Sequence, residues 1–403
     1  MMSAISLTGA GGNQNIYSDA AVSLAPTGCG VLDGLTFAAK DVFDVAGRVA
    51  SAGCPAFAAI HSPAPTTAPV IQRLRAAGAR LVGMTVTEEL MFGVLGQGVD
   101  APRNPVAPDR LVGGSSSGSA AAVAGGHCDF ALGTDTGGSV RVPASFCGLY
   151  GLRPSYGSVS IEGVVPLAPR FDTVGWLART PERLAAIGRV LLPECAAAPQ
   201  PKAIWMPPET TEGLDPTLVA EITLLAEALA ENLKVPLETQ PIGLGPADWG
   251  MAWKALQGRA CWETHGAWIK TCLPPLGSVA SRRFAAARAV SATEIVAGEK
   301  IVGKLQRSVL PRLRTGWLLV MPTTPCPAPR RSAPEAVLEA ARSTILSRTA
   351  LAGLLGLPEL SAPLISQDDL PVGLSLIGPS GADVALLELA TQTALHFSPP
   401  LKK

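Results

Sequence analysis

The stretch from Gly113 to Ala144 constrains this chain more than any other. It contains two clusters of glycine and hydroxyl residues, Gly113–Ser119 and Gly133–Ser139, joined by a link rich in alanine, valine and leucine. Glycine lacks a Cβ atom, so it allows backbone conformations and close approaches that other residues forbid. A flexible solvent linker would not be interrupted by such apolar residues. The stretch therefore indicates a structured site in which serine chemistry is possible.

Composition supports a large buried core. The chain has 403 residues, of which 47% are hydrophobic and 16% charged, and this excludes a disordered protein. Basic and acidic residues balance at 32 each, so charge favours neither nucleic acid nor an anionic membrane as a partner.

The sequence also predicts a location inside the cell. Residues Met1–Gly12 contain no basic residue and no sustained apolar run, which argues against a secretory signal. Apolar stretches such as Ala350–Ile365 are broken by glycine and proline well before the ~20 residues that a membrane-spanning helix needs. The eight cysteines have no C-x-x-C spacing, so we expect reduced thiols and no zinc site. We therefore expect a cytoplasmic protein without a membrane partner or a metal.

Helix and strand patterns alternate from one end of the chain to the other. This predicts one α/β domain over residues 1–403, with no linker that divides it. The segment 245–275 carries four tryptophans and is interpreted first as helical packing and second as a possible aromatic pocket wall. The expected helices are 67–77, 181–192, a helix from Pro216, and 382–395, and the expected strands are 35–39, 79–85, 202–206, 317–321 and 371–377.

Lys40 is the only lysine in the first 200 residues and ends the strand-like run Leu35–Ala39. From this segment alone, a surface lysine at a strand end is the favoured interpretation.

Three interpretations of the central stretch follow from its residues. Gly114–Gly118 matches the G-x-S-x-G elbow with Ser116 at its centre, but no strand long enough precedes it. The same run resembles the phosphate loop of small-molecule kinases, which would leave the cluster Gly133–Ser139 without a role. A binding module that keeps an enzyme fold without its chemistry is the third possibility.

A fourth interpretation comes from a resemblance to the amidase signature family. It is carried by Lys40-Asp41 in the pattern A-x-K-D-x-x-D-V-x-G, by V-G-G-S-S-S-G-S-A-A-A, and by G-T-D-T-G-G-S-V-R-x-P-A-S-x-C-G. The chain separations of Lys40, Ser115 and Ser139 agree with those of the family's Ser–Ser–Lys triad. The resemblance covers residues 33–395, with little specificity between 195 and 315. Within this family, the motifs are similar to those of plant-type indole-3-acetamide hydrolases and of the amidase-like domain of a chloroplast import receptor.

The resemblance implies a single α/β domain whose central mixed sheet is covered by helices. It implies a signature core at about 33–180, a variable substrate-side segment at about 195–315, and a return to the core at about 316–395. It also implies an amidase that hydrolyses a small primary carboxamide to acid and ammonia without a cofactor, as a monomer or homodimer. An aryl- or indole-acetamide is the expected substrate, and transamidation within a tRNA-dependent complex is a further possibility.

Residue roles are carried over in the same way. Ser139 is expected to be the nucleophile, Lys40 the base, and Ser115 the bridging residue, with a cis Gly114–Ser115 peptide bond. The expected oxyanion donors are the backbone amides of Thr136, Gly137, Gly138 and Ser139. The expected supporting residues are Ser116, Asp135 and Arg141, the last two as a pair that braces the loop. Candidates for the substrate pocket, for each of which core packing is the favoured alternative, are Met91, Phe92, Phe146, Cys147 and Trp176.

Two departures from the family pattern are visible. Ser117 stands where most members have glycine, although the plant-type branch shares the serine. The segment before Lys40 is short for the family, so a helical arm used elsewhere for docking or dimerisation is expected to be missing.

Overall fold

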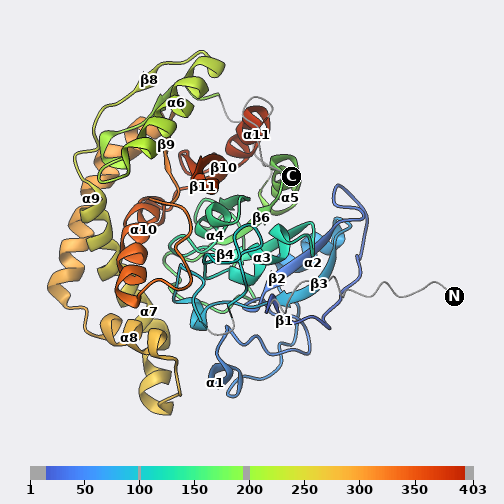
Figure 1. Cartoon of the computed structure of the whole chain (residues 1–403). Helices are drawn as coiled ribbons and strands as arrows, with labels where there is room; N and C mark the ends of the chain where they lie inside the picture. Colours follow the sequence, from blue (N-terminus) through green and yellow to red (C-terminus); the bar gives the residue numbers. More distant parts are fainter. Residues whose placement is uncertain (1–14, 99–100, 194–199, 395–403) are drawn as a thin grey trace.

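The computed structural model of the chain describes residues 15–98, 101–193 and 200–394 (Figure 1). Its centre is a mixed eleven-stranded sheet in the order β1-β3-β2-β4-β6-β5-β10-β11-β9-β7-β8. The strands are β1 Tyr17–Asp19, β2 Thr36–Lys40, β3 Arg80–Thr85, β4 Phe130–Thr134, β5 Tyr150–Arg153, β6 Val174–Ala178, β7 Ala203–Trp205, β8 Leu237–Glu238, β9 Trp317–Pro322, β10 Glu359–Gln367 and β11 Leu370–Ile377.

Helices cover this sheet. The long helices α7, α8, α9 and α10 lie together at one side of the molecule (Figure 1). The helices are α1 Pro55–Ala58, α2 Pro69–Ala76, α3 Ser117–Ala124, α4 Arg141–Phe146, α5 Pro181–Leu191, α6 Pro216–Leu233, α7 Pro246–Cys272, α8 Ser278–Arg288, α9 Ala292–Arg314, α10 Glu335–Leu355 and α11 Asp383–Ala394, with 3-10 turns η1 Glu89–Met91 and η2 Pro208–Thr210.

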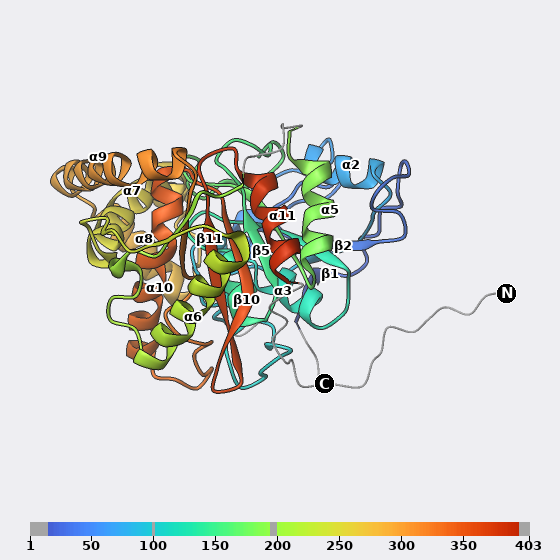
Figure 2. The same cartoon turned by 90° about the horizontal axis from the view of Figure 1, so that it is seen from above.

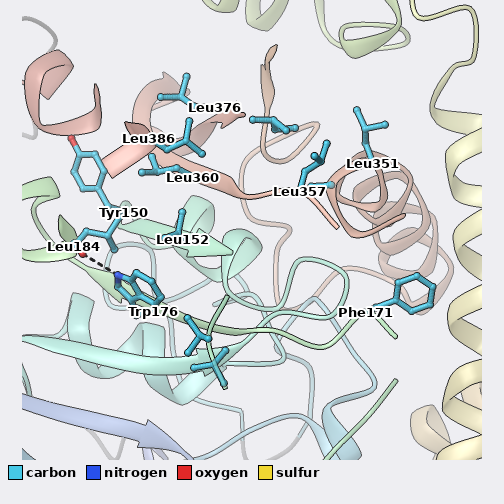
Figure 3. Packing of buried hydrophobic residues seen from close by; sticks show 14 of the residues in the cluster. Tyr150, Leu152, Phe171, Trp176, Leu184, Leu351, Leu357, Leu360, Leu376 and Leu386 are labelled. Carbon is cyan, nitrogen blue, oxygen red and sulfur yellow. Dashed lines mark hydrogen bonds between the residues drawn. The ribbon is translucent and has the colours of Figure 1, made fainter. Parts of the chain in front are cut away.

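The two faces of the central strands bury different partners. On one face α5 and α11 pack together, as Figure 2 shows from above, and the Trp176 indole donates to the carbonyl of Leu184 at 3.0 Å (Figure 3). On the other face Leu177 packs against the alanines of α3. Successive strand residues point to opposite faces, so β6 must be apolar at every position. Both faces of the middle of the sheet are therefore dry.

Local sequence signals explain several helix starts. Thr180 accepts a hydrogen bond from the Arg183 amide and Pro181 occupies the first turn of α5. Ser291 and Glu294 form a reciprocal capping box at the start of α9.

The predicted single α/β domain with a mixed sheet is confirmed, and the strands and helices expected from periodicity are present within a few residues of their predicted bounds. The segment 245–275 is helical, as α7. No helix within the described ranges is long and apolar enough to cross a lipid bilayer. The predictions for Met1–Gly12, for Cys195 and for the last residue of the closing helix lie outside the described residues.

Candidate active site

Lys40 ends β2 and is completely buried. Its Nζ donates to Ser115 Oγ at 2.8 Å and to Thr134 Oγ1 at 2.8 Å. Strands β2 and β4 are parallel neighbours, so their carboxyl ends meet at one edge of the sheet, and this places Thr134 beside Lys40. The prediction from the strand segment alone, that Lys40 lies on the surface, is wrong, because β2 lies inside the sheet between β3 and β4.

The environment of Lys40 favours an uncharged amine. Burial lowers its pKa from the ordinary 10.5 to about 7, although the charges of Glu88, Asp135 and Asp172 act in the opposite direction. A lysine with this pKa is neutral in about half of the molecules near neutral pH, so it can accept a proton there.

Ser115 and Ser139 are brought to adjacent loops. The Gly114–Ser115 peptide bond is cis, and the amide of Ser116 donates to the Ser139 carbonyl at 3.2 Å. The Ser139 hydroxyl donates to the carbonyl of Gly93 at 3.4 Å, and no hydrogen bond joins it directly to Ser115 in the described structure. A rotation of the Ser139 side chain is therefore needed before its hydroxyl can bond to Ser115.

Ser116 has a structural contact. Its hydroxyl donates to the carbonyl of Thr134 at 3.3 Å, which links the start of α3 to the end of β4. It makes no hydrogen bond with the Ser115 side chain within the described residues.

Asp135 organises the glycine loop that carries Ser139. Its carboxylate accepts two bonds from the Arg141 side chain, at 3.0 and 2.8 Å, so the expected pair is present. Arg153 Nη1 also contacts Asp135, and Glu359 holds the other side of the Arg141 guanidinium. Desolvation acts to raise the pKa of Asp135, but the two arginines more than offset it and hold that pKa well below its usual range. The loop thus rests on a buried, paired charge network.

Three of the four expected oxyanion donors have free amides. Within the described residues the backbone N–H groups of Thr136, Gly137 and Ser139 make no hydrogen bond. The amide of Gly138 donates to Asp135 Oδ1 at 2.8 Å, so the prediction that Gly138 donates to an oxyanion is wrong. The carboxylate that shapes the loop uses this donor. Three buried amides remain for a ligand.

A narrow slot leads to Ser139. It has a volume of about 20 Å³, room for one water-sized group, and is lined by Met91, Phe92, Gly93, Thr136, Gly137, Ser139, Leu167, Trp253, Gln257, Arg342 and Leu346. It meets a wider cavity of about 440 Å³ that shares Phe92, Trp253, Gln257, Arg342 and Leu346 with it. Trp253 closes over the oxyanion loop, since a Cβ atom on Gly137 would lie 2.4 Å from its ring.

Another cavity, of about 700 Å³, is lined by Glu88 and Arg283 but contains none of Lys40, Ser115 and Ser139. Size alone therefore does not identify the site. Among the described residues, no group of three or more His, Cys, Asp or Glu side chains could hold a metal ion.

Two of the five pocket candidates line the slot, namely Met91 and Phe92. The other three are core residues, and their assignment to the pocket is wrong. Phe146 packs against α10 residues and the loop near Leu95. The Cys147 thiol donates to the carbonyl of Val112 at 3.4 Å on the α3 side of the sheet. Trp176 lies against α5 on the opposite side.

Sequence reasoning missed several contributors. Thr134 is the second residue of the hydroxyl cluster Gly133–Ser139, and its position in that cluster was the available signal. Arg153 and Glu359 are charged residues in apolar surroundings, which could have signalled buried pairing. Gln257, Arg342 and Leu346 reach the slot only because α7 and α10 fold over the glycine loop. No local pattern marks them.

Comparisons with known proteins find relatives of the whole chain. A family model described as Amidase matches residues 17–223 and 270–387. Amidase 1 of Arabidopsis thaliana is 37% identical over 395 residues, covering 90% of this chain and 93% of that protein. The Translocon at the outer membrane of chloroplasts 64 of Pisum sativum is 32% identical over 389 residues, covering 89% of this chain and 65% of that protein. A crystal structure described as that of an amidase has a TM-score of 0.82 at 31% identity, covering 91% of this chain and 86% of that one.

Proposed function

The chain belongs to the amidase family, and from this premise we propose that it hydrolyses a small primary carboxamide through an acyl-enzyme on Ser139. The observation that carries the proposal is the contact between a fully buried amine and a serine hydroxyl, Lys40 Nζ to Ser115 Oγ at 2.8 Å. A serine hydroxyl becomes a useful nucleophile only when a nearby base takes its proton. Lys40 is suited to this task because its pKa is close to neutral.

The proposed first step is proton transfer through Ser115. Ser139 rotates away from Gly93 and donates to the Ser115 hydroxyl, which passes its own proton to neutral Lys40. Ser139 Oγ then bonds to the amide carbon. The proton returns through Ser115 to the nitrogen as the C–N bond breaks and ammonia leaves. Water then adds to the acyl carbon and gives a proton through Ser115 to Lys40. That proton returns to Ser139 Oγ as its bond to the acyl carbon breaks and the acid leaves.

The negative oxygen that forms on the carbonyl needs donors already in position. The amides of Thr136, Gly137 and Ser139 are free for this role, because the Asp135–Arg141 pair holds the loop that presents them. One such donor is often worth about 3–4 kcal/mol to the transition state. Thr136 is itself fixed, since its hydroxyl donates to Asp172 at 2.6 Å.

The shape of the site supports an arylacetamide-type substrate. The slot beside Ser139 is narrow, at about 20 Å³, so the atom next to the reacting carbonyl must be slim, as a methylene group is. The cavity of about 440 Å³ beyond it can receive a planar ring against Trp253 and Phe92. Phenylacetamide and indole-3-acetamide have this form.

The test measures ammonia release from a panel of primary amides, beside Ser139→Ala and Lys40→Ala. We expect turnover of arylacetamides by the wild type and a loss of at least about 10³-fold in kcat in both variants. A fluorophosphonate should add one adduct that peptide mapping places on Ser139. Ser308→Ala, which removes a partly buried serine of α9, is the matched control and should label like the wild type.

Two results would contradict the proposal. Absence of turnover across the whole panel would favour a binding module that has lost its chemistry. Undiminished turnover in Lys40→Ala would show that another group is the base.

A further inference from the structure

Arg342 presents an unused binding edge to the slot. It lies on α10 and lines both the slot and the wider cavity, with 16% of its side chain exposed. Its Nη1 donates to Glu339 Oε1 at 2.9 Å. Its Nε is buried without a hydrogen-bond partner, and its Nη2 makes no hydrogen bond with the described residues. The Nε–Nη2 edge of a guanidinium is shaped to bind a carboxylate through two parallel hydrogen bonds.

An unpaired buried donor is costly, and such groups in folded proteins call for an explanation. Helix α10 would tolerate an apolar residue here, because the neighbouring slot residues Trp253 and Leu346 are themselves apolar. A ligand that accepts from Arg342 supplies the missing partner.

The surroundings of Arg342 are positive. Among the described residues that line the slot, Arg342 is the only one that is charged. Burial lowers the pKa of Arg283 to about 10, and the nearby charge of Arg342 acts in the same direction, so the two guanidinium groups repel each other. The wider cavity adds two further basic and two acidic groups: Lys254, Arg282, Glu335 and Glu339.

Part of that charge is already neutralised. Arg282 pairs with Glu335 and Arg342 with Glu339, while Arg283 lies 3.8 Å from Glu88. Lys254 has no ion pair within the described residues, and the free edge of Arg342 faces no carboxylate there. An anionic group at the junction of slot and cavity would relieve this excess of positive charge.

We propose that the same site hydrolyses a second class of amide, the monoamides of short dicarboxylic acids, with the distal carboxylate bound by the Nε–Nη2 edge of Arg342. The inference rests on the proposed function, since the reacting carboxamide lies at Ser139 in both cases. The methylene chain runs from Ser139 past Trp253 and Leu346, which line both the slot and the wider cavity, and the carboxylate meets Arg342.

The reaction is an ordinary amide hydrolysis. The C–N bond breaks, the carbon bonds first to Ser139 Oγ and then to the oxygen of water, and the nitrogen leaves as ammonia. The product is a dicarboxylate, and no oxidant, reductant or cofactor is needed.

The experiment compares two matched substrate series by ammonia release. The acids are succinamate, glutaramate and adipamate, and their neutral partners are the linear amides in which a methyl group replaces the carboxylate. We expect the wild type to prefer at least one acid over its neutral partner by about tenfold or more in kcat/KM, mainly through a lower KM. A pair of charge-assisted hydrogen bonds between a carboxylate and a guanidinium contributes roughly this much to binding. The chain length with the largest preference measures the reach from Ser139 to Arg342.

Variants separate charge from fold. Arg342→Leu should lower the acid-to-neutral ratio of kcat/KM by about tenfold or more, and Arg342→Lys should restore part of it. Glu339→Gln removes the competing carboxylate and should raise the ratio. The matched control is Arg259→Leu, which breaks a similar intrahelical pair with Glu263, lines neither cavity and should keep the wild-type ratio.

The outcomes are distinct. Hydrolysis of the neutral amides with no preference for any acid would overturn the inference and leave the proposed function intact. A preference that survives Arg342→Leu would overturn the role of Arg342. Hydrolysis of neither series, nor of arylacetamides, would refute the proposed function and this inference together.

Discussion

Replacing Lys40 by methionine should abolish activity and stabilise the fold at neutral pH. Methionine has a similar length and no charge, so it can occupy the buried position at the end of β2. The folded-state pKa of Lys40 is about 7, against 10.5 for an ordinary lysine. Below the ordinary value the unfolded chain binds the proton, whereas the folded chain binds it only as the pH falls through about 7.

The magnitude follows from these two values. Between about pH 7 and 10.5 the unfolded state holds more protons, so stability rises with pH across this window, and below it the penalty is fully present. At about pH 7 the penalty is about 4 kcal/mol. The variant also loses hydrogen bonds to Ser115 and Thr134, worth about 1 kcal/mol each, so the expected net gain is about 2 kcal/mol.

Urea unfolding of both proteins at two pH values provides the assay. Their difference isolates Lys40, because other titrating groups are common to both proteins. Between about pH 7 and about pH 9.5 the wild type should gain about 3 kcal/mol relative to Lys40→Met. A stability difference that does not change with pH would refute the idea that burial depresses this pKa.

Three other predictions can be checked directly. In the wild type, kcat/KM for an amide should rise with pH and reach half its maximum near about 7, because the neutral form of Lys40 is the base; a flat pH–rate profile would contradict this. Asp135→Asn should destabilise the protein by about 3–5 kcal/mol in denaturant unfolding, because it removes one of the two carboxylates that pair with the buried Arg141; a change below about 1 kcal/mol would count against the network. Gly137→Ala should lower kcat by about 10²-fold or more, because its Cβ would lie 2.4 Å from the Trp253 ring, and adding Trp253→Leu should recover part of the loss; no recovery would mean that the ring contact is not the cause.

The two loops that carry Ser115 and Ser139 could be predicted because short sequence motifs mark them. The glycine and serine clusters lie near each other in the chain, and their local conformations follow from glycine's backbone freedom. The Asp135–Arg141 pair was likewise predictable, since the two residues are six positions apart on one loop and the following helix.

The pocket wall could not be predicted in the same way. Phe146 and Cys147 are close to Ser139 in sequence, and Trp176 belongs to the next segment of the signature core, yet each side chain faces a packed core. Trp253 and Arg342 are far away in sequence and form the slot. Proximity in sequence misled here because a helix or strand alternates its side chains between faces, and only packing decides which face meets the cavity.

By itself the sequence determined the α/β class, the alternation of elements and the identity of the two serine-bearing loops, because apolar periodicity and glycine patterns act locally. The tertiary structure decided that Lys40 is buried at the carboxyl end of an interior strand, that the Gly138 amide is bound to Asp135, and that Arg342 faces the slot with a free edge. These features depend on which distant segments come together around a dry interior. In that interior, the cost of desolvating a charge lowers the pKa of Lys40, and the same cost favours a ligand that accepts hydrogen bonds from the unpaired edge of Arg342.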